Sequence, residues 1–342
     1  MDLDLTAGLR IEHPPEHPTL RVPPHHPALP LRVGTRASPL ALAQSRSFVS
    51  VLTLACPFLG ATNAFQEHAM RTTGDRVQDR RLAEIGGKGL FAKEIHEALL
   101  QRRIDLAVHS LKDLETELPP GISLACVLKR EDARDALLLR DPIAGADPTD
   151  PLFSALPQGA LVGTSSVRRQ AQLLHARPDL RVTMLRGNVQ TRLAKLQEGE
   201  CDASLLALAG LRRLGLEDEA AVVLDPAAMV PAAGQGIVGI TAREDDEALR
   251  ELLAIIEDTE AREAATAERT MLAVLDGSCR TPIGAYAQRI EGGRLRLTGL
   301  VAREDGGFLL RRTVEGVPAD AERMGQELGA SLRADSPAAI FA

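Results

Sequence analysis

The sequence has few aromatic residues, with seven Phe, one Tyr and no Trp in 342 positions. Its core must therefore be built from aliphatic side chains, mostly those of Leu, Ala, Val and Ile. The chain also lacks the aromatic platforms on which single-stranded nucleic acids stack, and its net charge of −7 does not attract phosphate backbones. The composition thus argues against nucleic acid as a partner.

Cysteine patterns that bind metal or form disulfides are absent as well. The four cysteines lie far apart in the sequence and none belongs to a CxxC pair. This spacing favours reduced thiols in a cytoplasmic protein, with no disulfide framework and no metal site. No apolar run is long enough to span a membrane, so we expect no membrane partner. The cysteines are Cys56, Cys126, Cys201 and Cys279.

Residues 1–30 differ from the rest of the chain, because they hold seven of the 21 prolines and four of the eight histidines. They contain neither the apolar segment of a secretory signal nor the acid-poor composition of a transit peptide. Their histidines could bind a metal weakly, but a chain broken by prolines does not fix ligand geometry. We therefore predict a disordered extension.

The remaining chain is long enough for two or three domains, and its composition is typical of a soluble globular protein. A strand, a Gly turn and a Ser-capped helix occur twice, in GTRASPLALAQ near residue 34 and in GTSSVRRQAQ near residue 163. Each repeat continues with a helix that turns into another strand, at residues 90–108 and again at residues 188–209. This repetition predicts two α/β domains of similar topology.

A strand predicted at residues 104–109 ends in Ser110-Leu111-Lys112-Asp113. In open α/β sheets ligands bind beyond the carboxyl ends of strands, so Lys112 and Asp113 are candidate site residues. The alternative is a surface ion pair, which is the commoner arrangement for such neighbours.

Several cations occur at predicted helix starts and strand ends. Arg168 and Arg169 lie in the first turn of a helix, where positive charge opposes the helix dipole, and this suggests that an anionic ligand compensates them. If the cations share a cleft, an acidic protein would bind a small polyanion there, and carboxylates suit guanidinium groups well. For any single arginine, a solvated surface position is the alternative. The cations are Arg36, Lys88, Lys112, Arg168, Arg169, Arg186 and Arg192.

Cys279 follows a predicted helix at residues 262–275 and stands beside Arg280 on a Gly-containing turn. A thiol on a polar loop next to a cation is placed to ionise and form bonds. A buried, unreactive thiol is the alternative.

After this turn the sequence predicts three strands, at residues 283–289, 295–302 and 308–314, and a helix at residues 319–332. They predict a small α+β domain with a three-stranded antiparallel sheet, joined by Gly-Gly hairpin turns.

The chain contains an ordered series of motifs: GTRASPLALAQ, GDRVQD, GGKGLFAKE, AVHSLKD, GTSSVRRQAQL, RGNVQTRL, LALAGLRRLGL, AAGQGIVGI and GSCRTPIGAYA. Together they make residues 31 to about 335 resemble the porphobilinogen deaminase (hydroxymethylbilane synthase) family. The resemblance implies two periplasmic-binding-protein-like α/β domains and a third domain with the cofactor cysteine. Domain 1 is expected at residues 31–130 together with 236–256, domain 2 at residues 131–235 and domain 3 at residues 257–342. Short departures occur at Leu114-Glu115, where Val-Pro is more frequent in the family, and at Arg280-Thr281, where Gln-Val is familiar.

The resemblance also implies the activity, a transferase reaction in tetrapyrrole (haem) biosynthesis. Family members join four porphobilinogen molecules head to tail with loss of ammonia, on a dipyrromethane cofactor held as a thioether, and then release hydroxymethylbilane by hydrolysis. Cys279 matches the cofactor cysteine, and Asp113 matches the catalytic acid that stabilises positive charge as ammonia leaves and an azafulvene forms.

Other site residues carried over by the resemblance fall into two groups. The group expected to bind the cofactor comprises Lys88, Ser110, Lys112, Ser166, Arg168 and Arg169. The group expected to bind substrate carboxylates comprises Arg36, Ser38, Arg186, Gly187, Asn188, Arg192 and Gln235. We expect a cytoplasmic monomer without a metal. The rival hypothesis is a non-catalytic, two-lobed solute-binding protein for a small polyanion, which predicts a secretory signal and no need for Cys279.

Overall fold

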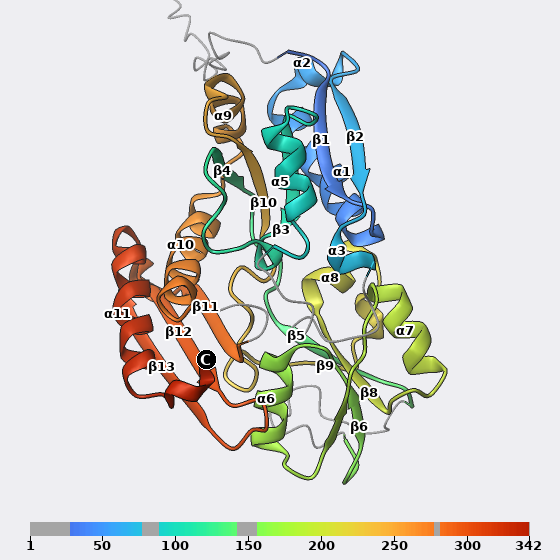
Figure 1. Ribbon diagram of the computed structural model, residues 1–342, viewed down its shortest axis with the longest axis vertical. Helices are drawn as coiled ribbons and strands as arrows, with labels where there is room; N and C mark the ends of the chain where they lie inside the picture. Colours follow the sequence, from blue (N-terminus) through green and yellow to red (C-terminus); the bar gives the residue numbers. More distant parts are fainter. Residues whose placement is uncertain (1–27, 77–88, 142–155, 277–280, 342) are drawn as a thin grey trace, which may run out of the picture.

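The computed structural model describes residues 28–76, 89–141, 156–276 and 281–341, arranged around three β-sheets (Figure 1). The predicted disorder of the N-terminal extension falls on residues 1–27, which lie outside the described residues. We call the two five-stranded sheets with their helices lobe 1 and lobe 2, and the three-stranded sheet with its helices the third domain.

Lobe 1 contains a mixed sheet in the order β2-β1-β3-β10-β4. Strand β1 pairs in parallel with β2 and β3, whereas β10 is antiparallel to both β3 and β4. Its core is aliphatic, with Phe48 as its one fully buried aromatic among the described residues. The strands are β1 Leu31–Arg36, β2 Phe65–Met70, β3 Leu106–Ser110, β4 Ile122–Val127 and β10 Val238–Arg243.

The first helix of lobe 1 begins where the sequence predicts. Ser38 accepts a hydrogen bond from the backbone N–H of Ala41 over 3.3 Å, and Pro39 occupies the first helical position. The apolar face of this helix packs on the sheet through Phe48 and Leu52, which are fully buried. The helices are α1 Pro39–Ala55, α2 Pro57–Gly60, α3 Thr73–Arg76, α5 Lys93–Leu100 and α9 Glu247–Ala254.

Lobe 2 repeats this topology with the order β7-β6-β8-β5-β9, in which β5 is the antiparallel strand. Its two longest helices begin at side-chain caps, Ser166 for α6 and Asn188 for α7. The strands are β5 Asp135–Leu139, β6 Leu161–Gly163, β7 Arg181–Thr183, β8 Ala203–Ala207 and β9 Val222–Val223. The helices are α6 Val167–Ala176, α7 Val189–Gln197 and α8 Leu208–Arg213.

Two crossing segments, residues 128–134 and 224–237, join the lobes. They run side by side, since Glu131 N–H donates to the carbonyl of Gly236 over 3.0 Å. Gly236 has a φ of +88°, and a Cβ at this position would lie 2.3 Å from the carbonyl oxygen of Glu131. Only glycine therefore permits this close approach of the two backbones.

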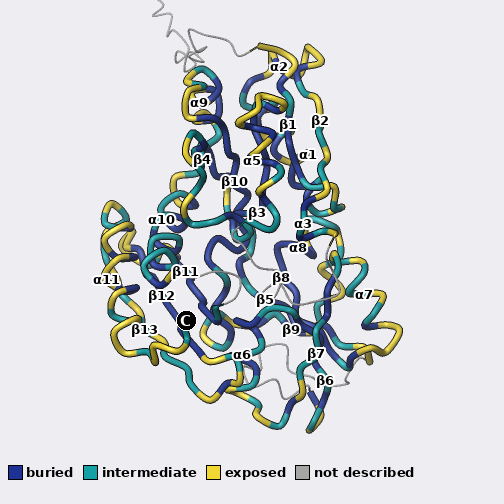
Figure 2. Tube along the Cα trace, viewed as in Figure 1, coloured by how far each residue is buried: buried dark blue, intermediate teal, exposed yellow. Residues whose placement is uncertain are grey.

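The third domain packs α10 and α11 on one antiparallel sheet, β11-β12-β13. Its hairpins turn at glycines, as predicted; Gly292 and Gly306 have φ values of 74° and 75°. The strands are β11 Ile283–Arg289, β12 Leu295–Ala302 and β13 Leu309–Gly316, and the helices are α10 Thr259–Val274 and α11 Ala321–Ala334. Figure 2 shows that the buried residues concentrate in the sheets and on the inner faces of the helices.

The predicted fold class is confirmed, with two α/β lobes of repeated topology and a small α+β domain. The Gly-rich segment at residues 230–240 leads from lobe 2 into β10, a strand of lobe 1. The numerical domain boundaries stay predictions. Within the described residues, no helix is both long and apolar enough to cross a membrane.

Candidate active site

Asp113 closes a single helical turn, Leu111–Asp113, directly after β3. The turn is anchored by Leu111, which is buried and whose N–H donates to the carbonyl of Ile237 over 3.0 Å. The side chain of Asp113 keeps 28% of its surface exposed. The end of β3 thus presents a carboxylate to solvent from a rigid turn attached to a crossing segment.

Arg36 lies beside this carboxylate, with 3.2 Å between its Nη1 and Oδ2 of Asp113. The same guanidinium pairs with Asp75 and lies over the ring of Phe91, 4.1 Å from the ring centre. Burial alone would raise the pKa of Asp75, but the hydrogen bond and charge of Arg36 hold it below its usual range. Asp75 therefore stays ionised and fixes Arg36 in place.

Lys112 points toward a crossing segment, where its Nζ donates to Oε1 of Gln235 over 3.1 Å. Burial lowers the pKa of Lys112 to about 8, and the charge of Arg169 acts in the same direction. The charges of Asp113 and Asp135 oppose this shift. Lys112 is thus a cation held among other cations, an arrangement that an added anion would stabilise.

Arg168 and Arg169 lie in the first turn of α6, as the sequence predicts, but both are buried against Asp135. Nη1 of Arg168 donates to Oδ2 of Asp135 over 2.7 Å, and Nη2 of Arg169 donates to Oδ1 over 2.7 Å. Nε2 of Gln235 donates to Oδ1 of the same carboxylate over 2.8 Å. Burial opposes ionisation, but the two guanidinium groups hold the pKa of Asp135 below its usual range.

Arg168 and Arg169 are therefore not the uncompensated pair that the helix dipole predicted. Two uncompensated cations in a first helical turn would need an external anion. Asp135 supplies one negative charge inside the fold, and the carbonyls of Val230 and Leu205 accept further hydrogen bonds from Arg168 and Arg169. Their role in binding a ligand stays a prediction that rests on the excess of cations around them.

The segment after β7 contributes further cations from lobe 2. Arg186 reaches across to lobe 1, where its Nη2 donates to the carbonyl of Gly74 over 3.2 Å. Gly187 has a φ of +120°, and Asn188 caps α7 through the N–H of Thr191. Asn188 and Gly187 thus shape the backbone at the start of α7.

Arg192 follows on the first turn of α7, and its Nε donates to the carbonyl of Gly187 over 3.0 Å. Burial lowers the pKa of Arg192 to about 10, and the charges of Arg169 and Arg186 add to the effect, while that of Asp113 opposes it. Arg192 is therefore within electrostatic reach of cations in lobe 2 and of the carboxylate of Asp113 in lobe 1.

The predicted serines have local partners. Ser38 and Ser166 cap α1 and α6, so their hydroxyls already accept backbone hydrogen bonds. Ser110 exchanges hydrogen bonds with the side chain of Gln44 at 2.9 and 3.0 Å. Lys88 and Cys279 lie outside the described residues, so their predicted roles stay predictions.

The site therefore draws its charged groups from both lobes and from the crossing segment between them. Its negative charges are Asp75, Asp113 and Asp135, and its positive charges are Arg36, Lys112, Arg168, Arg169, Arg186 and Arg192. Cations outnumber anions six to three within the described part of the chain. No group of histidine, cysteine or acidic side chains in these described residues could hold a metal ion.

Two family models match the chain. Residues 31–251 match the model described as porphobilinogen deaminase, dipyromethane cofactor binding domain, and residues 262–334 match the porphobilinogen deaminase C-terminal domain.

The chain belongs to the porphobilinogen deaminase family.

Curated members of this family match over most of their length. The porphobilinogen deaminase of Sorangium cellulosum is 49% identical over 307 residues, which cover 89% of this chain and 98% of the relative. That of Paracoccus denitrificans is 47% identical, covering 91% and 96%. A chloroplastic porphobilinogen deaminase of Oryza sativa is 45% identical, covering 91% and 85%.

Solved structures of other proteins match the chain only weakly. A periplasmic sulfonate-binding protein of Methylobacillus flagellatus matches with a TM-score of 0.36 and 14% identity, over 70% of this chain and 66% of its own. A periplasmic binding protein of Brucella ovis with bound glutathione matches with a TM-score of 0.37 and 15% identity, over 72% of this chain and 68% of its own. These scores are too low to carry an argument, and the family assignment does not depend on them.

The porphobilinogen deaminase family model is that of a dipyrromethane-binding domain, and the described residues fit such a group. A dipyrromethane built from two porphobilinogen units brings several carboxylates, and the site has a surplus of guanidinium and ammonium donors to receive them. Burial, followed by the charges of neighbouring arginines, lowers the pKa values of Lys112 and Arg192, so an added carboxylate beside them would favour their charged forms.

Three residues of this site have no role predicted from the sequence. Asp75 and Phe91 lie in motifs that carry the resemblance, GDRVQD and GGKGLFAKE, but the contacts of both with Arg36 depend on the fold. Asp135 gives no local signal, because its partners lie 33 and 34 positions further along the chain. A counter-ion at such a separation is recognised only once the sheets are assembled.

Proposed function

We propose that the chain is a porphobilinogen deaminase, which condenses four porphobilinogen molecules with loss of ammonia and releases hydroxymethylbilane by hydrolysis. The observation that carries the proposal is the position of Asp113, a partly exposed carboxylate surrounded by cations from both lobes. The family membership supports the same activity.

Asp113 is placed to accept hydrogen bonds from pyrrole N–H groups and to stabilise positive charge as ammonia leaves. Its hydrogen bond to Arg36 fixes the orientation of the carboxylate before substrate arrives. Such preorganised charge is usually the largest contribution that a protein makes to a reaction of this kind. The role of Asp113 is therefore electrostatic, with proton transfer to or from the reacting groups as a second contribution.

Arg36, Arg186 and Arg192 are the proposed ligands of substrate carboxylates, and Lys112, Arg168 and Arg169 are those of the cofactor. Guanidinium groups form paired hydrogen bonds with carboxylates and fix their orientation. The proposed cofactor is a dipyrromethane bound as a thioether to Cys279, where it supplies the primer to which pyrrole units are added.

Gln235 is proposed to hold Lys112 toward the cofactor, because its amide oxygen accepts from Lys112 while its amide nitrogen is fixed by Asp135. Ser38, Ser166 and Asn188 cap the helices that carry the site, and Gly187 leaves room for the start of α7. Ser110 and Lys88 remain proposed cofactor contacts.

We further propose that the protein acts as a cytoplasmic monomer on this small-molecule substrate. The three described cysteines, Cys56, Cys126 and Cys201, are buried free thiols, as expected in a reducing compartment.

The decisive experiment combines intact mass with product analysis. Wild-type protein should exceed its sequence mass by two linked pyrrole units, whereas Cys279→Ser should show the sequence mass. Cys201→Ser removes a buried thiol of lobe 2 and should keep the added mass. Incubation of the wild-type protein with porphobilinogen should release ammonia and form a linear tetrapyrrole.

Two results would contradict the proposal in different ways. Active wild-type protein at the unmodified mass would remove the cofactor assignment. Binding of porphobilinogen without release of ammonia would instead favour the non-catalytic solute-binding protein.

A further inference from the structure

The turn that carries Asp113 rests on one face of α10, a helix of the third domain. Ala261 and Ala265 are buried on this face and belong to the same apolar cluster as Leu111 and Leu114, the residues two before and one after Asp113. Positions four apart lie on one side of a helix, so the next residue of this stripe is Arg269. The small alanine side chains allow α10 to approach the turn closely.

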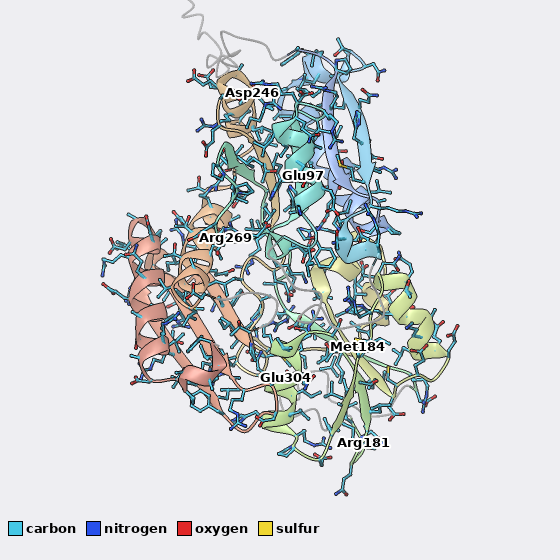
Figure 3. All side chains as sticks on the ribbon, viewed as in Figure 1. Glu97, Arg181, Met184, Asp246, Arg269 and Glu304 are labelled. Atoms are coloured by element: carbon cyan, nitrogen blue, oxygen red, sulfur yellow. The ribbon has the colours of Figure 1, made fainter. Side chains whose placement is uncertain are left out.

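Arg269 extends this contact with hydrogen bonds to three successive backbone carbonyls. Its Nη2 lies 2.6 Å from the oxygen of Glu115 and 3.1 Å from that of Thr116, and its Nη1 lies 3.5 Å from that of Leu114. Figure 3 shows Arg269 where α10 faces lobe 1. The segment that directly follows Asp113 is therefore held by a side chain from another domain.

This guanidinium keeps its charge although it is largely removed from water. Burial lowers the pKa of Arg269 to about 10, while the charge of Glu115 opposes the shift, so the side chain is still a cation at neutral pH. Hydrogen bonds from a charged donor are stronger than those between neutral groups. Without Arg269, the carbonyls of residues 114–116 would lose their partner from α10, and the chain after Asp113 would gain freedom.

We infer that Arg269 is a positioning residue for Asp113, which holds residues 114–116 on α10 and so fixes the carboxylate of Asp113 relative to the third domain. This inference rests on the proposed function. Arg269 precedes Cys279 by ten positions, on the helix that leads to it. The contact therefore links the part of the chain that carries the proposed acid to the part that carries the proposed cofactor cysteine.

Arg262 provides a matched control on the same helix. Arg262 and Arg269 both line a cavity of about 340 Å³ between α10 and lobe 1. Like Arg269, Arg262 donates from Nη2 to a carbonyl of lobe 1, that of Leu124, over 3.1 Å. However, Leu124 belongs to β4 and not to the turn with Asp113. Loss of Arg262 removes this contact between domains, together with its ion pair to Glu257, without releasing residues 114–116.

The experiment compares Arg269→Gln, Arg269→Lys and Arg262→Gln as purified proteins that carry the dipyrromethane. Single-turnover addition of porphobilinogen measures the chemical step, and hydrogen exchange of residues 111–118 measures the freedom of the turn. Arg269→Gln should add porphobilinogen on the order of a hundredfold more slowly, because small displacements of a reacting group have effects of this size. Its exchange at residues 111–118 should rise, while its KM for porphobilinogen stays close to that of the wild type.

Arg269→Lys should lie between the wild type and Arg269→Gln in both measurements, since an ammonium group can still donate to one of the carbonyls. Arg262→Gln should resemble the wild type in both. If Arg269→Gln does not fold or does not take up the cofactor, Arg269→Lys carries the test, because its rate and exchange must change together.

Three outcomes would overturn the inference: a wild-type rate in Arg269→Gln, an equal loss of rate in Arg262→Gln, or slow addition without increased exchange in either Arg269 variant. Wild-type protein that adds no porphobilinogen would instead refute the proposed function, so the two failures are distinguishable.

Discussion

The side chains of Lys112 and Gln235 join the end of β3 to a segment that crosses between the lobes, with 3.1 Å between Nζ and Oε1. The other end of the same amide donates to Asp135, at the start of β5 in lobe 2. One glutamine thus connects the neighbour of the proposed acid with the buried counter-ion of Arg168 and Arg169. The charge of Asp135 also acts on Lys112, where it opposes the lowering of the lysine pKa by burial.

The first prediction concerns the protonation of Lys112. In Cys279→Ser protein without cofactor, Lys112 should lose its proton near pH 8, because burial and neighbouring cations lower its pKa to about 8. Nuclear magnetic resonance of the lysine side chains would follow the titration, with Lys112→Arg used to assign the signal. The cofactor-loaded protein should titrate at higher pH, because added carboxylates favour the ammonium form. A midpoint near the ordinary lysine value in both proteins would contradict the predicted environment.

The second prediction is that Asp113 carries the chemistry rather than the binding. Asp113→Asn keeps the size and an acceptor oxygen but removes the charge, so single-turnover chain growth should fall on the order of a hundred- to a thousandfold. Asp113→Glu keeps a displaced charge and should retain more activity than the Asn variant. Porphobilinogen binding, measured separately, should change little in either.

Asp105→Asn is the matched control for this prediction. Asp105 is another acid of lobe 1, paired with Arg32 beyond the opposite end of β3, and its loss should leave chain growth near the wild-type rate. Near-normal growth in Asp113→Asn would exclude the assigned role. Equal losses of binding and rate would make Asp113 a substrate anchor.

The third prediction concerns the buried charge of Asp135. Asp135→Asn leaves Arg168 and Arg169 buried without their counter-ion, and removing one partner of a buried pair typically lowers the free energy of unfolding by about 3–5 kcal/mol. Denaturant unfolding of the two proteins measures the difference. Asp141→Asn, which affects an exposed acid of lobe 2 paired with Arg140, should change stability little.

The difference in stability between the wild type and Asp135→Asn should also depend on pH. The folded-state pKa of Asp135 lies below that of an unfolded Asp, about 3.9, so its contribution is present above this value and is lost as pH falls toward the folded-state pKa. The stability difference between wild type and Asp135→Asn should therefore stay constant from neutral pH to about pH 4 and narrow below it. If the stability difference already disappears near pH 6, the two arginines do not keep Asp135 in its ionised form at that pH.

The fourth prediction concerns Glu268 on α10, whose side chain is fully buried. Its carboxylate accepts hydrogen bonds from Arg130 and from the N–H groups of Gly234 and Ala287, so it ties both crossing segments to the third domain. Glu268→Gln should lower the free energy of unfolding by about 3–5 kcal/mol, since Arg130 loses its counter-ion. Denaturant unfolding would measure this change.

Glu263 on the same helix provides the comparison for Glu268. It pairs with Arg289 near the surface, where ion pairs contribute about 0–1 kcal/mol. Glu263→Gln should therefore be much less destabilising. Similar losses in the two variants would mean that the burial of the Glu268 pair has no energetic consequence.

Local sequence signals predicted much of this fold. Ser38 and Ser166 cap helices through N–H groups three residues further along, and the hairpins turn at Gly292 and Gly306. Caps and turns of this kind involve only residues that are close in the sequence, so their patterns can be recognised there. The position of Asp113 at the end of a strand was accessible for the same reason. Strand β2, with its exposed and half-exposed residues, was not predicted because it shows no apolar run.

The partners of the site residues were less accessible. The sequence indicated that Arg168 and Arg169 need a negative charge but could not show that Asp135 supplies it, because this contact forms only when β5 enters the sheet of lobe 2. Phe91 likewise meets Arg36 only through the folding of lobe 1. Long-range contacts of this kind depend on sheet order, which local periodicity does not determine.

The place of β10 in lobe 1 has a consequence for synthesis on the ribosome. Among the described strands, β4 pairs only with β10, although every strand of lobe 2 is made before β10. The sheet of lobe 2 can therefore close while that of lobe 1 still lacks an inner strand, and the edges of β3 and β4 stay unpaired in the meantime. Unpaired edges of this kind attract other chains. The lobe that carries Asp113 therefore begins before lobe 2 but can close only after it.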